Sequence, residues 1–116
     1  DNLGTLYYYG RGVAQDYAQA MSWYRKAADQ GYALAQFNIG WLYDNGKGVT
    51  QDYAQAASWY RKAADQGNAN AQNNLGALYY YGRGVAQDYA QAKSWFRKAA
   101  DQDFATAKAW LEKLPK

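Results

Sequence analysis

The sequence contains no cysteine and no histidine. A disulfide framework, a thiolate zinc site, a cysteine nucleophile and every catalytic triad built on histidine are therefore excluded. No run of about 18 or more apolar residues is present, so membrane insertion is not expected, and no N-terminal apolar region marks a signal peptide. Basic residues exceed acidic residues by only 13 to 10, well short of a nucleic-acid-binding tail.

Aromatic residues are abundant instead and make up 18% of the chain. Glycines and tryptophans recur every 36 residues, at Gly4, Gly40 and Gly76 and at Trp23, Trp59 and Trp95. A fixed period of about 20–50 residues is typical of a solenoid. We therefore interpret residues 1–116 as a single repeat array, with copies at about 1–32, 33–68 and 69–104 and a terminal helix at about 105–114.

Each copy contains two helical segments. In the middle copy, one face of the first segment carries apolar residues at helical spacing, namely Ala35, Ile39, Leu42 and Tyr43. The second segment runs from about Tyr53 to Asp65, with Asp52 as N-cap and Gln55 completing a capping-box pattern. No segment alternates as a strand does, so the pattern predicts an all-α array of helix pairs.

Glycine inside a helix costs about 1 kcal/mol relative to alanine. Its recurrence at Gly40 and Gly76 predicts a close helix crossing that admits no Cβ atom. A single helix pair cannot bury its apolar face, so stacking on the next pair is expected to supply the core.

The positions shared by the copies are, in the middle unit, Ala35, Ile39-Gly40, Tyr43, Gly46-Lys47-Gly48-Val49, Asp52, Ala56, Trp59-Tyr60, Ala63-Ala64 and Gly67. This pattern resembles the Sel1-like repeat, a relative of the tetratricopeptide repeat with a slightly longer unit. The resemblance implies a right-handed α-solenoid of antiparallel helix pairs whose first helices line the concave surface. It also implies a non-enzymatic scaffold or adaptor that binds another protein or peptide, in the cytoplasm, the periplasm or outside a bacterial cell.

We call the set of equivalent positions in successive copies, 36 residues apart, a column. Differences between the copies are confined largely to one face of the first helix, in the columns of Leu34, Phe37, Trp41, Asp44 and Asn45. An invariant asparagine column lies at the edge of the same face. We expect a peptide or extended segment to bind there, through Asn2, Tyr8, Phe37, Asn38, Trp41, Asp44, Asn73, Asn74, Tyr80 and Tyr81.

Two questions about this face stay open. The asparagine column either bonds the backbone of a bound peptide or forms hydrogen bonds to a neighbouring helix. The aromatic residues either form a binding hot spot or cover the junction between stacked pairs, although Trp41 is assigned to the groove because Thr5 and Ala77 occupy its column elsewhere. The constant Tyr43 and Tyr79 are expected in the core.

Other functions find less support. The Gly46-Lys47-Gly48 segment follows a helix and lacks the third glycine of a phosphate-binding loop, which argues against phosphate binding. The carboxylates do not cluster, and cysteine and histidine are absent, so neither a cofactor nor a metal is expected. The recurring Arg61-Lys62 pair is interpreted as a solvated outer face, with a surface for RNA or acidic polymers as the alternative.

Two alternatives to peptide binding remain. One is a structural spacer, or a designed or recently duplicated array without a ligand. The other is a carbohydrate contact at the cell envelope through exposed Tyr and Trp rings. The first helix of the first copy lacks its opening turn, which predicts self-association of the chain.

Overall fold

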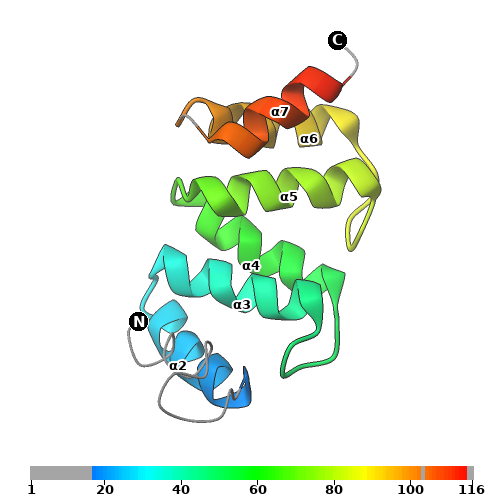
Figure 1. The fold of residues 1–116 in the computed structure, drawn as a ribbon. Coiled ribbons are helices and arrows are strands. Elements are labelled where there is room, and N and C mark those ends of the chain that lie inside the picture. Colours follow the sequence, from blue (N-terminus) through cyan, green and yellow to red (C-terminus); the bar gives the residue numbers. More distant parts are fainter. Residues whose placement is uncertain (1–16, 103, 115–116) are drawn as a thin grey trace.

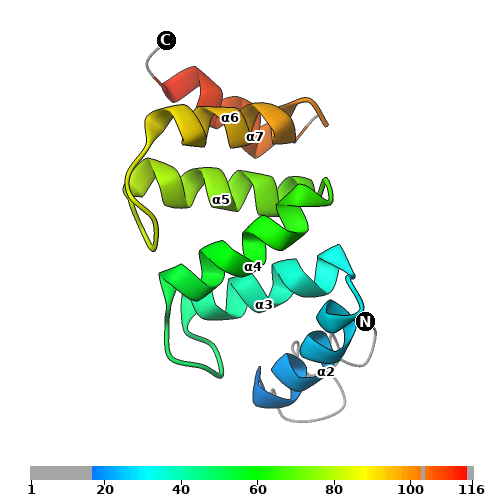
Figure 2. The same ribbon diagram turned by 180° about the vertical axis from the view of Figure 1, so that it is seen from behind.

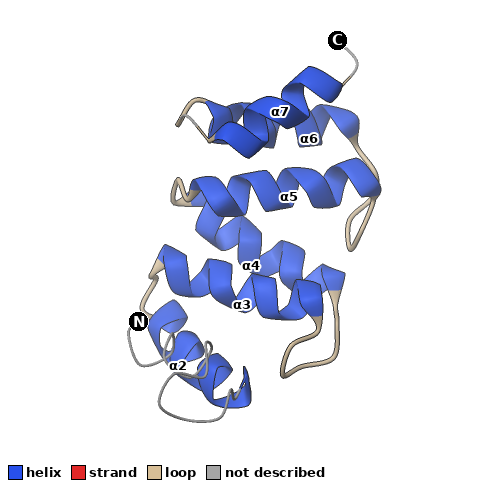
Figure 3. Ribbon diagram, in the orientation of Figure 1, coloured by secondary structure: helices blue, strands red, loops and turns tan. Residues whose placement is uncertain are grey.

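The computed structural model describes residues 17–102 and 104–114. These residues form six helices and no strand (Figure 3), in the order α2 (Tyr17–Asp29), α3 (Ala33–Asn45), α4 (Tyr53–Asp65), α5 (Ala69–Tyr81), α6 (Tyr89–Ala100) and α7 (Ala105–Lys113). The all-α repeat fold predicted from the sequence is confirmed. None of these helices is both long and apolar enough to cross a membrane.

The helices are arranged in two layers. Figure 1 shows α3, α5 and α7 side by side toward the viewer, with α4 and α6 behind them, and the reverse view in Figure 2 brings α4 and α6 to the front. Every extensive contact between the described helices joins consecutive ones. The result is an elongated body of 47 × 27 × 23 Å, as expected when each unit packs only against its neighbours.

Glycine terminates the second helix. Gly67 has a φ of +92°, which L side chains rarely adopt. Its amide donates to the carbonyl of Ala64 at 2.9 Å, and the amide of Asn68 donates to that of Ala63 at 3.2 Å. These two bonds form a Schellman motif, which confirms that Gly67 is the residue that follows the helix end.

The N-terminus of α4 is capped as the sequence predicts, but only in part. The side chain of Asp52 accepts a hydrogen bond from the amide of Gln55 at 3.1 Å. The amide of Asp52 itself donates to the carbonyl of Tyr43 at 3.0 Å. In a capping box, the Gln55 side chain would accept a hydrogen bond from the Asp52 amide. Here that amide is bonded to the preceding helix instead, so the reciprocal half of the expected capping box is absent.

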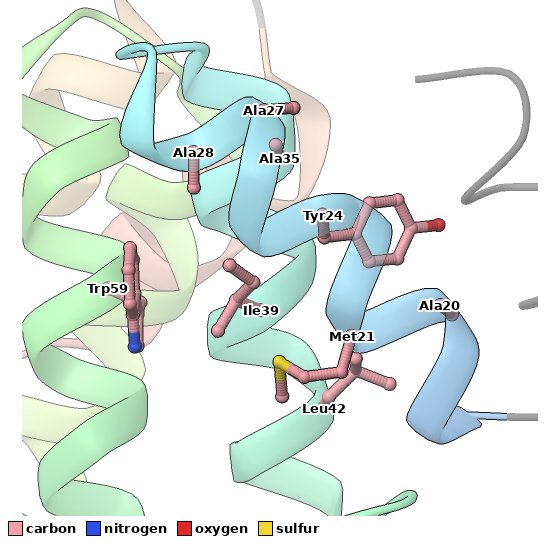
Figure 4. Close-up of a cluster of buried hydrophobic side chains, with 9 residues drawn as sticks. All are labelled: Ala20, Met21, Tyr24, Ala27, Ala28, Ala35, Ile39, Leu42 and Trp59. Carbon is pink, nitrogen blue, oxygen red and sulfur yellow. The ribbon is translucent and has the colours of Figure 1, made fainter.

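The core is built between copies. Figure 4 shows one cluster in which Tyr24 of α2, Ile39 and Leu42 of α3, and Trp59 of α4 are all buried. Three helices from two copies thus share one apolar cluster, and equivalent clusters follow along the array. Stacking between pairs supplies the core, as expected for units that cannot bury their apolar faces alone.

The helical glycines mark close crossings. A Cβ atom on Gly40 would lie 2.6 Å from Cδ1 of Tyr60, and one on Gly76 would lie 2.8 Å from Cε1 of Phe96. The crossings predicted from the sequence are therefore confirmed at both positions, whereas Gly4 lies outside the described residues.

The basic residues that recur on the second helices do more than face solvent. Trp95 lies between two cations, with Arg61 of α4 at 5.8 Å and Lys98 of its own helix at 4.4 Å from the ring centroid. Trp59 is flanked in the same way, with Arg25 at 5.6 Å and Lys62 at 4.3 Å. Each arginine thus reaches the tryptophan of the next copy, a link between copies that sequence patterning did not predict.

Glutamines also connect the copies. The side-chain amide of Gln66 donates to Oε1 of the buried Gln36 at 2.8 Å. Gln36 in turn lies 3.4 Å from the carbonyl of Ala28, to which it donates. Gln102 and Gln72 repeat the side-chain bond one copy later at 3.0 Å. These bonds satisfy buried polar groups at the turns between second and first helices.

Candidate partner-binding site

A cleft of about 230 Å³ opens between the C-terminal halves of α3 and α5, the neighbouring helices toward the viewer in Figure 1. We call it the α3/α5 cleft, and it is lined by Trp41, Asp44, Asn45, Asn74, Ala77, Leu78, Tyr81 and Arg83. Four residues predicted from the variable face therefore lie together: Trp41, Asp44, Asn74 and Tyr81.

The cleft combines apolar and aromatic surfaces. Leu78 is buried, and Ala77 beside it is half-buried. Trp41 is half-buried against the core cluster of α2, α3 and α4, while Tyr81 keeps 49% of its surface exposed. Partly exposed rings held by a packed helix offer large contact area at little cost in conformational entropy.

Asp44 is the acidic group of the cleft. It is half-buried, and its Oδ2 accepts a hydrogen bond from the hydroxyl of Tyr60 at 2.8 Å. Burial raises the pKa of the Asp44 carboxyl, and the Tyr60 hydrogen bond and the positive charge of Arg83 partly oppose this rise.

Arg83 is the basic group, and it comes from the loop that follows α5. Its guanidinium lies 4.6 Å from the ring centroid of Tyr81 and 5.6 Å from that of Tyr53. Gly84 has a φ of +73°, and a side chain there would overlap the backbone of Tyr53. The glycine thus lets the loop approach the start of α4 closely and holds Arg83 beside the cleft.

A chain of side-chain hydrogen bonds runs behind the cleft from α5 through α4 to α3. Asn73 donates to Oδ1 of Asn74 at 3.3 Å, and Asn74 is 3.5 Å from the Tyr60 hydroxyl, to which it donates. The Tyr60 hydroxyl then donates to Asp44. For Asn74, a bond to a neighbouring helix, one of the two roles left open for the asparagine column, is therefore present.

The other predicted residues lie elsewhere. Phe37 is half-buried and stacks on Tyr60 of its own helix pair with ring centroids 5.7 Å apart. It also packs against the buried cluster that joins α4 to α5, which places it at the junction with the next pair. Asn73 is only 6% exposed, and its Oδ1 has no hydrogen-bond partner. Asn38 is half-buried and does not line the cleft. Asn2 and Tyr8 lie outside the described residues.

The two tyrosines predicted for the core are half-buried. Tyr43 and Tyr79 pack with their rings against buried clusters. Their hydroxyls accept hydrogen bonds from Arg25, at 3.4 Å, and from Arg61 respectively. They therefore join the core to the basic residues of the second helices.

The next junction along the array has the same geometry and different chemistry. In the columns of Asp44, Tyr60 and Asn74 it carries Tyr80, Phe96 and Trp110. The indole of Trp110 stacks on Phe96, with centroids 5.1 Å apart and planes 7° apart, and lies 5.0 Å from the Tyr80 ring. Contacting rings thus occupy the α5/α7 junction, whereas polar side chains line the cleft at the α3/α5 junction.

Sequence reasoning missed two important members of the site. One is Tyr60, whose equivalents in the other copies are Tyr24 and Phe96. Its hydroxyl contributes to the site because it donates a hydrogen bond to Asp44. A signal was available, since the columns of Asp44, Tyr60 and Asn74 all change together in the following copy. Arg83 gave no such signal because its column is basic in every copy.

The described ranges contain no group of three acidic side chains that could hold a metal ion. The site consists of one carboxyl group, one guanidinium, side-chain amides and aromatic rings. Such groups are suited to non-covalent recognition of a segment that carries both polar and aromatic groups.

Comparisons with known proteins agree with this architecture. The Sel1 repeat family matches residues 2–32, 33–68 and 69–104. A protective antigen of uropathogenic Escherichia coli strains with this fold superposes with a TM-score of 0.89 at 45% identity, over 91% of this chain and 23% of the antigen. A Sel1 repeat protein from Oxalobacter formigenes gives 0.90 at 41% identity, over 95% of this chain and 45% of that protein.

Cysteine-rich protein B of Helicobacter pylori is also similar, with a TM-score of 0.73 at 30% identity over 82% of this chain and 69% of that protein. No curated protein sequence matches. The chain spans less than half of the Escherichia coli and Oxalobacter proteins. Sel1 repeat proteins are generally scaffolds for protein interactions and are typically not catalytic. With three matched repeats across nearly its whole length, the chain belongs to the Sel1 repeat family.

Proposed function

We propose that the chain is an interaction scaffold that binds an extended peptide segment of another protein in the α3/α5 cleft. The cleft lies on the layer of first helices, where the copies differ most. A scaffold built from near-identical units needs such differences to distinguish partners, because the shared positions are occupied with building the fold.

The observation that carries the proposal is the contrast between two equivalent junctions. Trp110 and Tyr80 fill the α5/α7 junction with rings 5.0 Å apart. Asn74 and Asp44 stand in the same columns of the α3/α5 junction and leave a cleft of about 230 Å³. An open polar cleft next to an equivalent junction occupied by contacting rings supports a binding role for the open cleft.

The lining suits a peptide. Extended chains expose amide donors and carbonyl acceptors, and the side chains of Asp44, Asn45, Asn74 and Arg83 supply acceptors and donors of both kinds. Trp41 and Tyr81 supply the aromatic area that dominates most interaction hot spots.

The test is a selection of random 12-residue peptides against the chain, followed by affinity measurements on the enriched peptides by fluorescence anisotropy. Ala77→Trp is expected to abolish binding, because the indole ring would occupy the cleft. Tryptophan is already the residue at the equivalent position of the preceding copy, Trp41. Replacing Trp41 and Asn74 together by alanine should weaken binding by tenfold or more. Lys93→Ala, on α6 and away from the residues that line the cleft, is the matched control and should leave the affinity unchanged.

Thermal unfolding followed by circular dichroism verifies that each variant remains folded. Peptides that bind all the variants equally would show that the cleft is not the site. Failure to enrich any peptide would favour the spacer hypothesis, and selective binding of glycans on an array would favour the carbohydrate hypothesis.

A further inference from the structure

We infer that the α3/α5 cleft accepts an aromatic side chain that carries a hydrogen-bond donor, a tyrosine or tryptophan of the bound segment. The inference rests on the proposed function and specifies which residue of the partner anchors it. Three features of the cleft support this assignment: a missing ring, an acceptor and a cation.

The missing ring is seen by comparison with the α5/α7 junction. There the Trp110 indole lies 5.0 Å from Tyr80 and 5.8 Å from Tyr81, measured between ring centroids. In the α3/α5 junction the Trp110 column holds the smaller Asn74, and the Tyr80 column holds Asp44. Tyr81 lines the α3/α5 cleft as well, so one ring of the aromatic cluster already faces the open space.

The acceptor is Asp44. One of its oxygens, Oδ2, already accepts the hydroxyl proton of Tyr60. An ionised carboxylate has about four acceptor sites and no donor, so it retains capacity for an O–H or N–H group in the cleft. Hydrogen bonds to a charged acceptor contribute about twice as much as bonds between neutral groups. A guest ring with a donor at its edge can meet this acceptor, and a phenylalanine ring cannot.

The cation is Arg83, and it favours a neutral ring over a charged guest. Its guanidinium lies 4.6 Å from the centroid of Tyr81, so it can lie over the face of a ring placed beside that tyrosine. A lysine or arginine guest would pair with Asp44 but would be repelled by Arg83. An acidic guest would pair with Arg83 but would be repelled by Asp44.

Cations over ring faces are a recurring contact in this chain. Lys62 lies 4.3 Å from the centroid of Trp59, and Lys98 lies 4.4 Å from that of Trp95. An aliphatic guest would gain only the apolar floor of Ala77 and Leu78. Because a site that offers a hydrogen bond discriminates against analogues that lack the matching group, tyrosine and tryptophan are the preferred guests.

The experiment uses capped amino acids as probes, titrated into the isotope-labelled chain and followed by NMR. The probes are the N-acetyl amides of tyrosine, tryptophan, phenylalanine, leucine and arginine. The tyrosine and tryptophan amides are expected to shift the signals of Asn74 and Ala77 and to bind about tenfold more tightly than the phenylalanine amide. In Asp44→Asn this preference should fall to about threefold or less, whereas Lys93→Ala should preserve it.

Equal affinity for the tyrosine and phenylalanine amides would overturn the inference, as would tighter binding of the leucine or arginine amide. The absence of shifts in the cleft at tens of millimolar probe would also overturn it. The proposed function fails separately: selected peptides that lose affinity in Ala77→Trp but contain no Tyr or Trp would uphold peptide binding and refute the aromatic anchor.

Discussion

The hydroxyl of Tyr60 on α4 donates a 2.8 Å hydrogen bond to Oδ2 of Asp44 on α3. Tyr60 is fully buried, and its ring occupies the space left by Gly40. This single side chain therefore joins the close crossing of a helix pair to the acidic group of the α3/α5 cleft. Changes at Tyr60 are expected to affect both stability and the cleft.

Replacing Tyr60 by phenylalanine should lower the free energy of unfolding by about 1–2 kcal/mol at neutral pH. The variant keeps the ring but leaves the half-buried Asp44 carboxylate without its donor. Chemical denaturation measures the loss. The following copy offers a control. Phe96→Tyr adds a hydroxyl opposite Tyr80 rather than opposite a carboxylate, so it should not raise the free energy of unfolding.

The double variant Tyr60→Phe with Asp44→Tyr reproduces the pair found as Phe96 and Tyr80 one copy later. It should recover most of the stability lost in Tyr60→Phe, because no carboxylate remains to be satisfied. A double variant less stable than Tyr60→Phe alone would contradict the role given to this bond.

The stability contributed by Asp44 should depend on pH in an unusual direction. The folded-state pKa of the Asp44 carboxyl lies above its ordinary value of 3.8, chiefly because burial disfavours the charge. Between these two values the folded chain binds more protons than the unfolded chain, so the free energy of unfolding falls as pH rises. Relative to Asp44→Asn, the wild type should be most stable below pH 3.8 and lose this advantage as pH rises through the folded-state pKa.

Unfolding by urea at several pH values, with both proteins measured side by side, gives this difference directly. Other titrating groups are common to the two proteins and cancel. A difference that grows in favour of the wild type as pH rises through this range would mean that the carboxyl pKa is lowered on folding.

Gly40→Ala should destabilise the chain although alanine is the better helix former. The added Cβ would lie 2.6 Å from Cδ1 of Tyr60, which is fully buried and cannot move freely. Overpacking of this kind costs about 1–3 kcal/mol, against a gain of about 1 kcal/mol in helix propensity. Thermal unfolding should show a lower midpoint, and Gly76→Ala should behave alike. An unchanged or higher midpoint in both variants would refute the close crossing.

Arg61→Ala should cost about 0.5–1 kcal/mol, because Arg61 contacts the Trp95 ring of the next copy. Arg97 occupies the same column, and no ring contact is found for it within the described residues. Arg97→Ala is therefore the matched control and should change stability by much less. A double-mutant cycle between Arg61 and Trp95 isolates the contact, and a coupling energy near zero would remove the proposed link between copies.

Asn73→Leu should raise the stability of the chain by about 1 kcal/mol. The Asn73 side chain is buried, and its Oδ1 has no partner, so its carbonyl loses hydration without compensation. Because so little of this residue is exposed, peptide affinity should stay unchanged. A stability loss would show that the bond from Asn73 to Asn74 outweighs the unpaired oxygen.

Much of the fold follows from local sequence. The second helix was expected from about Tyr53 to Asp65 and has these bounds. The N-cap at Asp52 and the terminating glycine at Gly67 are properties of short segments. The N-cap aspartate recurs in all three copies and the terminating glycine in two of them. The helical glycines at positions 40 and 76 were informative because an unfavourable residue recurred at a fixed place.

The cleft was harder to predict because it depends on how copies meet. Sequence comparison placed Trp41, Asp44 and Asn74 on one face, but not the separation between α3 and α5 that leaves space between them. The bond from Tyr60 to Asp44 and the contact from Arg61 to Trp95 join residues 16 and 34 positions apart. Such contacts are set by the crossing angles of packed helices rather than by local propensity.

Asn73 illustrates a different difficulty. Its column varies between copies, as a binding residue would, yet the structure buries its side chain. Variation in this column accompanies changes in packing, as Phe37 also shows by stacking on Tyr60. Variation between copies therefore identifies the layer of first helices as the one in which the copies differ. It does not distinguish residues that line the cleft from residues that pack between helices.

The most direct test of a binding site in the α3/α5 cleft is to map a selected peptide by NMR chemical-shift perturbation of the backbone amides. The proposal predicts that the largest shifts cluster at Trp41, Asp44, Asn74 and Tyr81. It also predicts little change at Lys93 and Arg97 of α6, which do not line the cleft. Shifts concentrated on the second helices, with the cleft unchanged, would contradict the proposal.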